Sequence, residues 1–225
     1  MVADFARFLV RPVYAGQPLI WGQGAALLLL AVLALDVAFA GIFLWISDLW
    51  DASAGFLPEP IESEEALTEE LFLTLLFAPI IEEALFRGWL TGQYAALRFA
   101  AYGMGALVLS LVTLFLPDSL AELVGFAGLA LALAGLIHWT RTRRRDTVIP
   151  AWFTRHFHWF VWGSTLFFGL IHLGNFEPLT HPLGVLVVLP QTVGGLLLAY
   201  TRTRLGLGAA IAHHVAFNAV WLAGG

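Results

Sequence analysis

Seven apolar stretches, each near the length that crosses a lipid bilayer, constrain the fold of this chain more than any other feature. They cover residues 24–46, 71–91, 100–116, 120–140, 159–176, 183–201 and 206–223. A membrane-spanning helix needs about 20 mostly apolar residues at a rise of about 1.5 Å each. The third and last stretches are short, so the sequence predicts about seven transmembrane helices, within a range of six to eight.

The composition is that of a membrane protein rather than a soluble one. Of the 225 residues, 60% are hydrophobic and 12% are charged, and the mean hydropathy is +0.83. A typical soluble domain is about 45–50% apolar and about 25% charged. A soluble globule of this size could not bury so much apolar surface. We therefore expect an all-α polytopic helix bundle that forms a single membrane domain over residues 1–225.

Two residue types are absent from the sequence, and their absence excludes several kinds of site. Without cysteine, the chain can form no disulfide, thiolate metal site or cysteine nucleophile. Without lysine, all 11 basic residues are arginine, and they form no basic face suited to nucleic acid. The expected partner is the lipid bilayer, and the sequence indicates no oligomeric state.

The arginines predict the orientation in the membrane. Ten of them precede the first apolar stretch or lie in alternate loops: Arg7, Arg11, Arg98, Arg141, Arg143, Arg144, Arg145, Arg155, Arg202 and Arg204. Because cytoplasmic loops carry the excess of basic residues, we expect a cytoplasmic N-terminus and an external C-terminus. The short loops and the exclusive use of arginine favour a bacterial inner-membrane protein. Arg87 is the exception, since it lies inside the stretch 71–91.

The segment 47–70 is strongly acidic and has the position of an extracytoplasmic loop. Its carboxylates are Asp48, Asp51, Glu59, Glu62, Glu64, Glu65, Glu69 and Glu70. Ser63 followed by two glutamates predicts a helix start, because a serine cap and early anions suit a helix N-terminus. We interpret the segment as a solvated lead-in to the second apolar helix.

Several polar side chains lie inside the apolar stretches, where charge is expensive. An Asp, Lys or Arg at the bilayer centre costs about 2.5–3.5 kcal/mol, so such residues usually face the bundle interior, pair or serve a function. The residues concerned are Asp36, Glu82, Glu83, Arg87, His172, His213, His214 and Asn218.

Helical spacing sorts these residues into faces. Glu83 and Arg87 are four apart, so they can form an ion pair, whereas Glu82 lies about 100° around the helix and has no partner there. The pairs His214 with Asn218 and Phe168 with His172 are also four apart, and each pair shares a face. We therefore predict that three helices present Glu82, His172, and His214 with Asn218 to one site.

Four further positions carry expectations of their own. Pro79 removes a backbone hydrogen bond and should kink the helix just before Glu82 and Glu83. Asp36 and His213 are interpreted as structural, because neither has a patterned partner. His172 falls near the outer end of its helix, so we expect the Gly- and Pro-containing stretch 174–182 to dip back into the membrane and line the cavity.

Three motifs in a fixed order carry a resemblance to a known family. Residues 82–87 match EExxxR, residues 168–172 match FxxxH, and residues 214–218 match HxxxN. Over residues 71–223 the chain resembles the CPBP family, also called the CAAX-protease and bacteriocin-processing or Abi family, which is related to the Ras-converting CAAX endopeptidases.

The resemblance implies an intramembrane endopeptidase that cleaves a membrane-associated protein or peptide. In this family pattern Glu82 would activate water, His172 would help to hold that water, and His214 and Asn218 would stabilise the oxyanion. Glu83 and Arg87 would form a supporting pair, with Phe168 as an aromatic wall beside His172.

The use of a metal stays open at this stage. The family was first described as metalloproteases, and Glu82, His172 and His214 could bind Zn²⁺ with an open water position. There is no HExxH pair, however, and the same residues can act without metal as a glutamate-type protease. Two other functions remain as alternatives: a polar-cored transporter or proton pathway, and a non-catalytic family member.

Overall fold

The computed structural model describes residues 2–61 and 67–224, and these residues are predominantly helical. The elements are α1 (Val2–Val10), α2 (Gln23–Ala54), α3 (Leu67–Phe72), η1 (Leu73–Phe77), α4 (Ala78–Phe86), η2 (Gly88–Thr91), α5 (Tyr94–Thr113), α6 (Asp118–Thr142), α7 (Ala151–Arg155), α8 (Phe157–Ile171), η3 (His172–Asn175), η4 (Pro182–Val188), α9 (Leu189–Leu205) and α10 (Leu207–Gly224). In the described ranges there is no β-strand, only an isolated bridge between Pro60 and Phe176. The all-α prediction is therefore confirmed.

Four helical segments are long and apolar enough to cross a membrane. They are Gln23–Asp51, Tyr94–Thr113, Asp118–Thr142 and Pro182–Leu205, and Leu207–Ala223 is a shorter apolar helix. Large apolar side chains on these helices are exposed, as expected for helices that face lipid. The chain is thus a polytopic membrane protein, whereas the predicted number of about seven spans is not confirmed.

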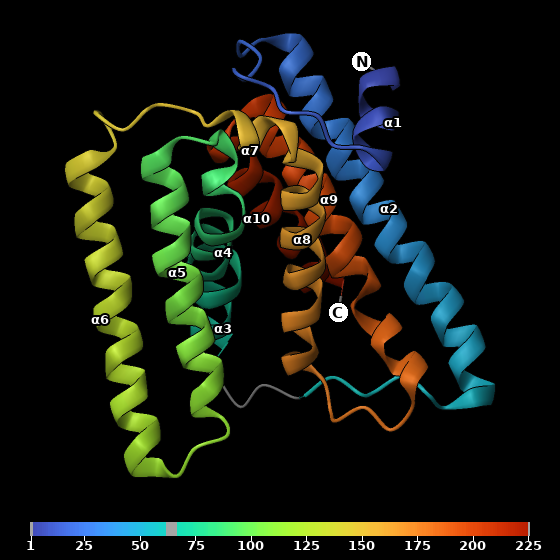
Figure 1. Cartoon of the computed structure of the whole chain (residues 1–225). Coiled ribbons are helices and arrows are strands. Elements are labelled where there is room, and N and C mark those ends of the chain that lie inside the picture. Colours follow the sequence, from blue (N-terminus) through green and yellow to red (C-terminus); the bar gives the residue numbers. More distant parts are fainter. Residues whose placement is uncertain (1, 62–66, 225) are drawn as a thin grey trace. The chain divides into compact units, whose positions relative to one another are not determined.

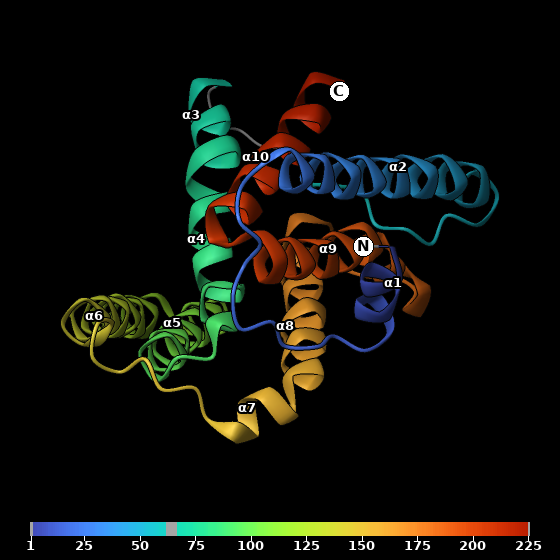
Figure 2. The same cartoon turned by 90° about the horizontal axis from the view of Figure 1, so that it is seen from above.

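The helices form two compact units. The first contains Met1–Glu83 and Phe157–Gly225, and the second contains Ala84–His156. Within the first unit, α9 packs against α2, α8 and α10, as Figures 1 and 2 show. Residues 194–203 of α9 are all buried, which identifies it as the central helix of this unit. The predicted single domain stays a prediction.

Glycine allows α9 to approach its neighbours closely. A Cβ added at Gly169 of α8 would lie against the side chain of Thr192 and 3.3 Å from its Cα. A Cβ at Gly194 would lie 3.2 Å from Oδ1 of Asp36 on α2. Both glycines therefore set the helix separations in the region where the polar residues gather.

The end of α2 lies further along the chain than the apolar pattern predicts. The helix runs to Ala54 and closes at Gly55 in the left-handed conformation, with φ 60°. Oδ1 of Asp51 accepts hydrogen bonds from the backbone N–H groups of Phe56 (2.7 Å) and Leu57 (3.0 Å). The acidic segment 47–70 consequently begins on the last turns of α2. The helix start predicted at Ser63 lies outside the described residues.

The N-terminal helix α1 is tied to the end of α9. Nε and Nη2 of Arg204 donate to the Asp4 carboxylate at 2.8 and 2.9 Å, and the Tyr200 hydroxyl donates to it at 3.2 Å. The hydrogen bond from Arg204 lowers the pKa of Asp4 below its ordinary value of 3.8. These contacts hold α1 against α9 within the first unit, which also contains most of the polar residues discussed below.

The second unit is built around the antiparallel helices α5 and α6, which lie side by side in Figure 1. A Cβ at Gly105 would lie 2.9 Å from Leu131, and one at Gly135 would lie 2.5 Å from Tyr102. These glycines allow the two helices to pack closely. An ion pair between Arg98 and Asp146 joins the start of α5 to the segment after α6.

Candidate active site

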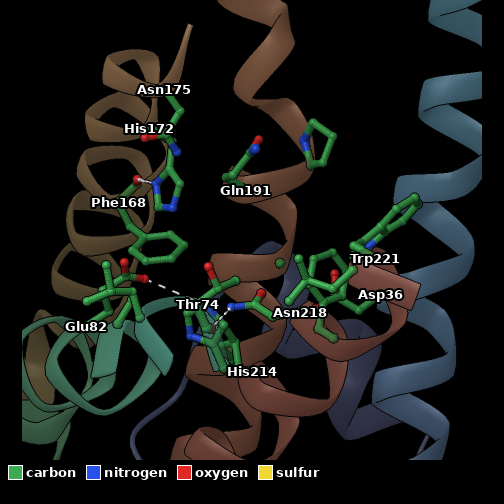
Figure 3. A pocket seen from close by; sticks show the side chains of 17 residues that line it. Asp36, Thr74, Glu82, Phe168, His172, Asn175, Gln191, His214, Asn218 and Trp221 are labelled. Carbon is green, nitrogen blue, oxygen red and sulfur yellow. Dashed lines mark hydrogen bonds and ion pairs between the residues drawn. The ribbon is translucent and has the colours of Figure 1, made fainter. Parts of the chain in front are cut away.

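The first unit encloses a pocket of about 540 Å³. Such a volume is within the range of small-molecule and substrate sites. It is lined by Asp36, Leu73, Thr74, Ala78, Glu82, Phe168, His172, Asn175, Pro190, Gln191, Gly194, Leu198, His214, Phe217, Asn218, Trp221 and Leu222. Glu82, Phe168, His172, His214 and Asn218 are therefore brought together, as the sequence predicts (Figure 3).

His214 lies between two adjacent carboxylates. Its Nδ1 is 3.1 Å from Oε1 of Glu83, and its Nε2 is 3.7 Å from Oε2 of Glu82. A carboxylate only accepts hydrogen bonds, so Nδ1 carries the proton that is shared with Glu83. Glu83 is fully buried and His214 is 6% exposed. Glu83 thus fixes the orientation of the ring, and Nε2 is the nitrogen directed towards Glu82.

Asn218 is held by a backbone carbonyl on the helix that carries Glu82. Its Nδ2 donates to the oxygen of Thr74 at 2.8 Å. Thr74 lies in the π-helical segment Leu73–Phe77, where the N–H of Ala78 donates to Leu73. In a regular α-helix or π-helix the Thr74 carbonyl would accept from the N–H of residue 78 or 79. The N–H of Ala78 is bonded to Leu73 and Pro79 has no N–H, so the carbonyl accepts from Asn218 instead.

A π-helical turn, Leu73–Phe77, lies just before Pro79, whereas the predicted kink stays a prediction. Such single turns often mark functional sites. Here the π-helical turn leaves the Thr74 carbonyl oxygen to accept a hydrogen bond from Asn218, which lines the pocket. The sequence predicts a kink at Pro79, but not the contact of Asn218 with Thr74.

His172 and Phe168 form the aromatic part of the pocket. Nδ1 of His172 is 2.7 Å from the backbone oxygen of Phe168, and since a carbonyl only accepts, this nitrogen carries a proton. The Phe168 ring lies 4.6 Å from the His172 ring and 6.1 Å from the His214 ring, edge-on to both. Figure 3 shows Phe168 between the two imidazoles. It is the aromatic wall that the FxxxH spacing predicts.

The stretch after His172 contributes one residue to the pocket. Asn175, the last residue of η3, lines it. The backbone there pairs with the segment before α3, since Ile61 N–H donates to Asn175 at 2.9 Å and Glu177 N–H donates to Glu59 at 2.9 Å. The predicted return of residues 174–182 into the membrane stays a prediction.

Asp36 and His213 form a pair that the sequence does not reveal. Oδ2 of Asp36 on α2 is 3.2 Å from Nε2 of His213 on α10, and Nδ1 of His213 is 3.1 Å from Oγ1 of Thr201 on α9. No spacing rule links residues on three different helices. The contact of Asp36 thus comes from another helix rather than from a residue at helical spacing, and Asp36 also lines the pocket. The predicted pair of Glu83 with Arg87 spans the two units and stays a prediction.

The arrangement of donors does not suit a zinc ion. In the described part of the chain, no group of three or more His, Cys, Asp and Glu residues is placed to hold a metal. Both nitrogens of His214 face carboxylates, and Nδ1 of His172 is bonded to a carbonyl. A catalytic zinc site needs three protein ligands converging on one point. We therefore derive no step through a metal.

Comparison with known families agrees with this site. Residues 144–220 match the family model described as "Type II CAAX prenyl endopeptidase Rce1-like". This match, over about a third of the chain, supports an assignment to the CPBP/CAAX protease family. The comparisons with curated proteins and with solved structures found no match.

The matched segment covers two of the three motifs. Phe168, His172, His214 and Asn218 lie within residues 144–220, whereas Glu82 precedes them. The match supports a protease, and therefore a hydrolase, that is embedded in the membrane. The individual roles of the pocket residues are the subject of the proposal that follows.

Proposed function

We propose that this chain is an intramembrane endopeptidase that hydrolyses a peptide bond of a membrane-associated protein or peptide in the pocket around Glu82. The observation that carries the proposal is the convergence of Glu82, His214 and Asn218, from two separate helical segments, on one pocket. Hydrolysis needs an activated water and donors for the developing oxyanion. These residue types supply both.

Glu82 is proposed as the general base. Its side chain is 26% exposed and lines the pocket, so a water molecule in the pocket could donate to the carboxylate. As the water oxygen attacks the carbonyl carbon, Glu82 takes the proton. When the carbon–nitrogen bond then breaks, the same carboxyl group returns a proton to the leaving amine.

Asn218 and His214 are proposed to stabilise the oxyanion. One N–H of the Asn218 amide is bonded to Thr74, which orients the other N–H as a donor. The proton on Nδ1 of His214 is directed at Glu83, so Nε2 can donate only when the ring is doubly protonated. In this proposal His214 donates from Nε2 in that doubly protonated form, whereas the neutral ring is expected from the sequence.

His172 is proposed to help hold the attacking water. Because Nδ1 carries the proton bonded to Phe168, Nε2 is the ring nitrogen that can accept a hydrogen bond. Its place at the pocket wall, separated from His214 by the Phe168 ring, suits a role in positioning water.

A cleavage assay with a peptide library tests this function. The purified full chain in lipid nanodiscs is incubated with the library in H₂¹⁸O, and new termini are identified by mass spectrometry. We expect one ¹⁸O atom in each new carboxylate, and a rate that is unchanged by 1,10-phenanthroline. Loss of activity with the chelator and recovery with Zn²⁺ would contradict the metal-independent mechanism. No cleavage, together with pH-dependent ion flux into liposomes, would favour a transporter.

A further inference from the structure

Asp36 is a second buried acid at the pocket, and the proposed reaction does not use it. Its side chain is 3% exposed, and it lines the pocket across from Glu82 in Figure 3. Gly194 of α9 packs against this carboxylate, because an added Cβ would lie 3.2 Å from Oδ1. The fold therefore places an acid at this wall of the pocket and leaves no room between it and α9.

One oxygen of Asp36 lies beside the ring of His213. Nε2 of His213 is 3.2 Å from Oδ2, within ion-pair distance, but makes no hydrogen bond within residues 2–61 and 67–224. The ring is held from its other side, because Nδ1 lies 3.1 Å from the hydroxyl of the fully buried Thr201. These contacts define the position of the Asp36 carboxylate next to the His213 ring.

The other oxygen of Asp36, Oδ1, is buried and has no hydrogen-bond partner among the described residues. A buried carboxylate with an unused oxygen is costly, and a donor from a ligand would remove that cost. A cationic donor would remove most of it, since hydrogen bonds to a charged group are stronger than neutral ones.

The rest of the pocket also favours a cation. Asp36 and Glu82 are its two acidic lining residues, and no lining residue is arginine or lysine. Trp221 lies beside Asp36 in Figure 3, and an ammonium or guanidinium group near an indole face gains a cation–π contact.

We propose that Asp36 binds a cationic group of the substrate: a lysine or arginine side chain, or a free N-terminal ammonium. The cation pairs with the carboxylate from the side that lines the pocket, while Oδ2 lies beside the His213 ring. This inference rests on the proposed protease function, since it names the class of peptide that the site selects. The selected peptide would carry this cation close to the peptide bond that is hydrolysed beside Glu82.

A binding measurement tests the site without requiring cleavage. The probes are dansylcadaverine, which carries a primary ammonium, and its N-acetyl derivative, titrated into the full chain in nanodiscs. We expect the ammonium probe to bind about 10- to 100-fold more tightly, as one hydrogen bond to a charge allows. Asp36→Asn should bind the two probes alike, whereas the control Asp48→Asn, at an exposed position of α2, should keep the preference.

Two further measurements complete the test. Asp36→Ala serves if Asp36→Asn does not fold, as judged by thermal unfolding. Matched peptides with lysine, arginine or norleucine, each with a free or acetylated N-terminus, then identify the source of the cation. Equal binding of both probes by the wild type, or a preference retained in both Asp36 variants, would overturn the proposal. A preference for the cation without any cleavage would refute the protease function alone, and cleavage without preference would refute the cation site alone.

Discussion

Asn218 illustrates how one side chain in this pocket depends on the backbone of a distant helix. Its amide is oriented by the Thr74 carbonyl, and that carbonyl is available because Pro79 has no N–H and Ala78 bonds to Leu73. We propose that the second amide N–H donates to the oxyanion. Its contribution to the reaction should be that of a preorganised donor.

Replacing Asn218 by alanine should lower kcat by about 100- to 1,000-fold, the usual loss when one oxyanion donor is removed. Asn175→Ala is the matched control, because Asn175 lines the same pocket but has no proposed role in the reaction. Steady-state kinetics with a cleaved peptide give both values, and thermal unfolding tests whether each variant folds. An Asn218→Ala enzyme with a normal kcat would exclude the amide from the oxyanion site.

The sequence predicts most of the pocket residues but not their pairing. Glu82, His172, His214 and Asn218 can be selected because polar residues at helical spacing are rare inside apolar stretches. The contact of His214 with Glu83 and that of Asp36 with His213 join different helices. Contacts of this kind depend on how helices are rotated against each other, which spacing along one helix does not encode.

At the scale of the elements, the contact of α8 with α9 controls the site. Phe168 is the residue before Gly169, and the absence of a side chain at Gly169 allows Thr192 of α9 to approach. A methyl group there would meet the backbone of α9 as well as a side chain. The two helices would have to separate, and the aromatic wall would move away from His214.

Gly169→Ala should therefore destabilise the protein by about 1–3 kcal/mol, as overpacking of a helix contact does. Gly163→Ala is the matched control on the same helix, since a Cβ at Gly163 meets nothing within 4 Å. Alanine favours a helix over glycine by up to about 1 kcal/mol, so this variant should be as stable as the wild type or more so. Thermal unfolding in detergent compares them, and equal stability of the two variants would contradict the packing argument.

The ends of the helices were less predictable than their existence. The apolar pattern ends the first long helix near residue 46, but α2 continues to Ala54. Its end is set by local hydrogen bonds, namely the left-handed Gly55 and the carboxylate of Asp51, which accepts from Phe56 and Leu57. Hydropathy marks where lipid contact ends, whereas capping marks where the helix ends.

At the scale of the whole molecule, the distribution of arginine predicts how the chain lies in the membrane. We propose a cytoplasmic N-terminus, which would place the arginine-rich segment after α6 on the cytoplasmic face. The start of α6 would then be external. The natural sequence contains no cysteine, so single cysteines can report this orientation without background labelling.

Ser119→Cys lies in the first turn of α6 and Thr147→Cys lies after its end, and both positions are exposed. In intact spheroplasts, a membrane-impermeant maleimide should label Ser119→Cys, and it should label Thr147→Cys only after permeabilisation. Because the reagent reaches one face of the membrane, the pattern depends only on the orientation. The opposite pattern would invert the proposed topology.

The central claim is that Glu82 activates water for peptide hydrolysis, and the kcat/KM of Glu82→Gln tests it most directly. Glutamine keeps the size of the side chain and removes the base, so kcat/KM should fall by at least about 100-fold while thermal unfolding is unchanged. Glu69→Gln, an exposed position on α3, should retain wild-type activity. A Glu82→Gln protein that cleaves peptides at the wild-type rate would contradict the proposed mechanism.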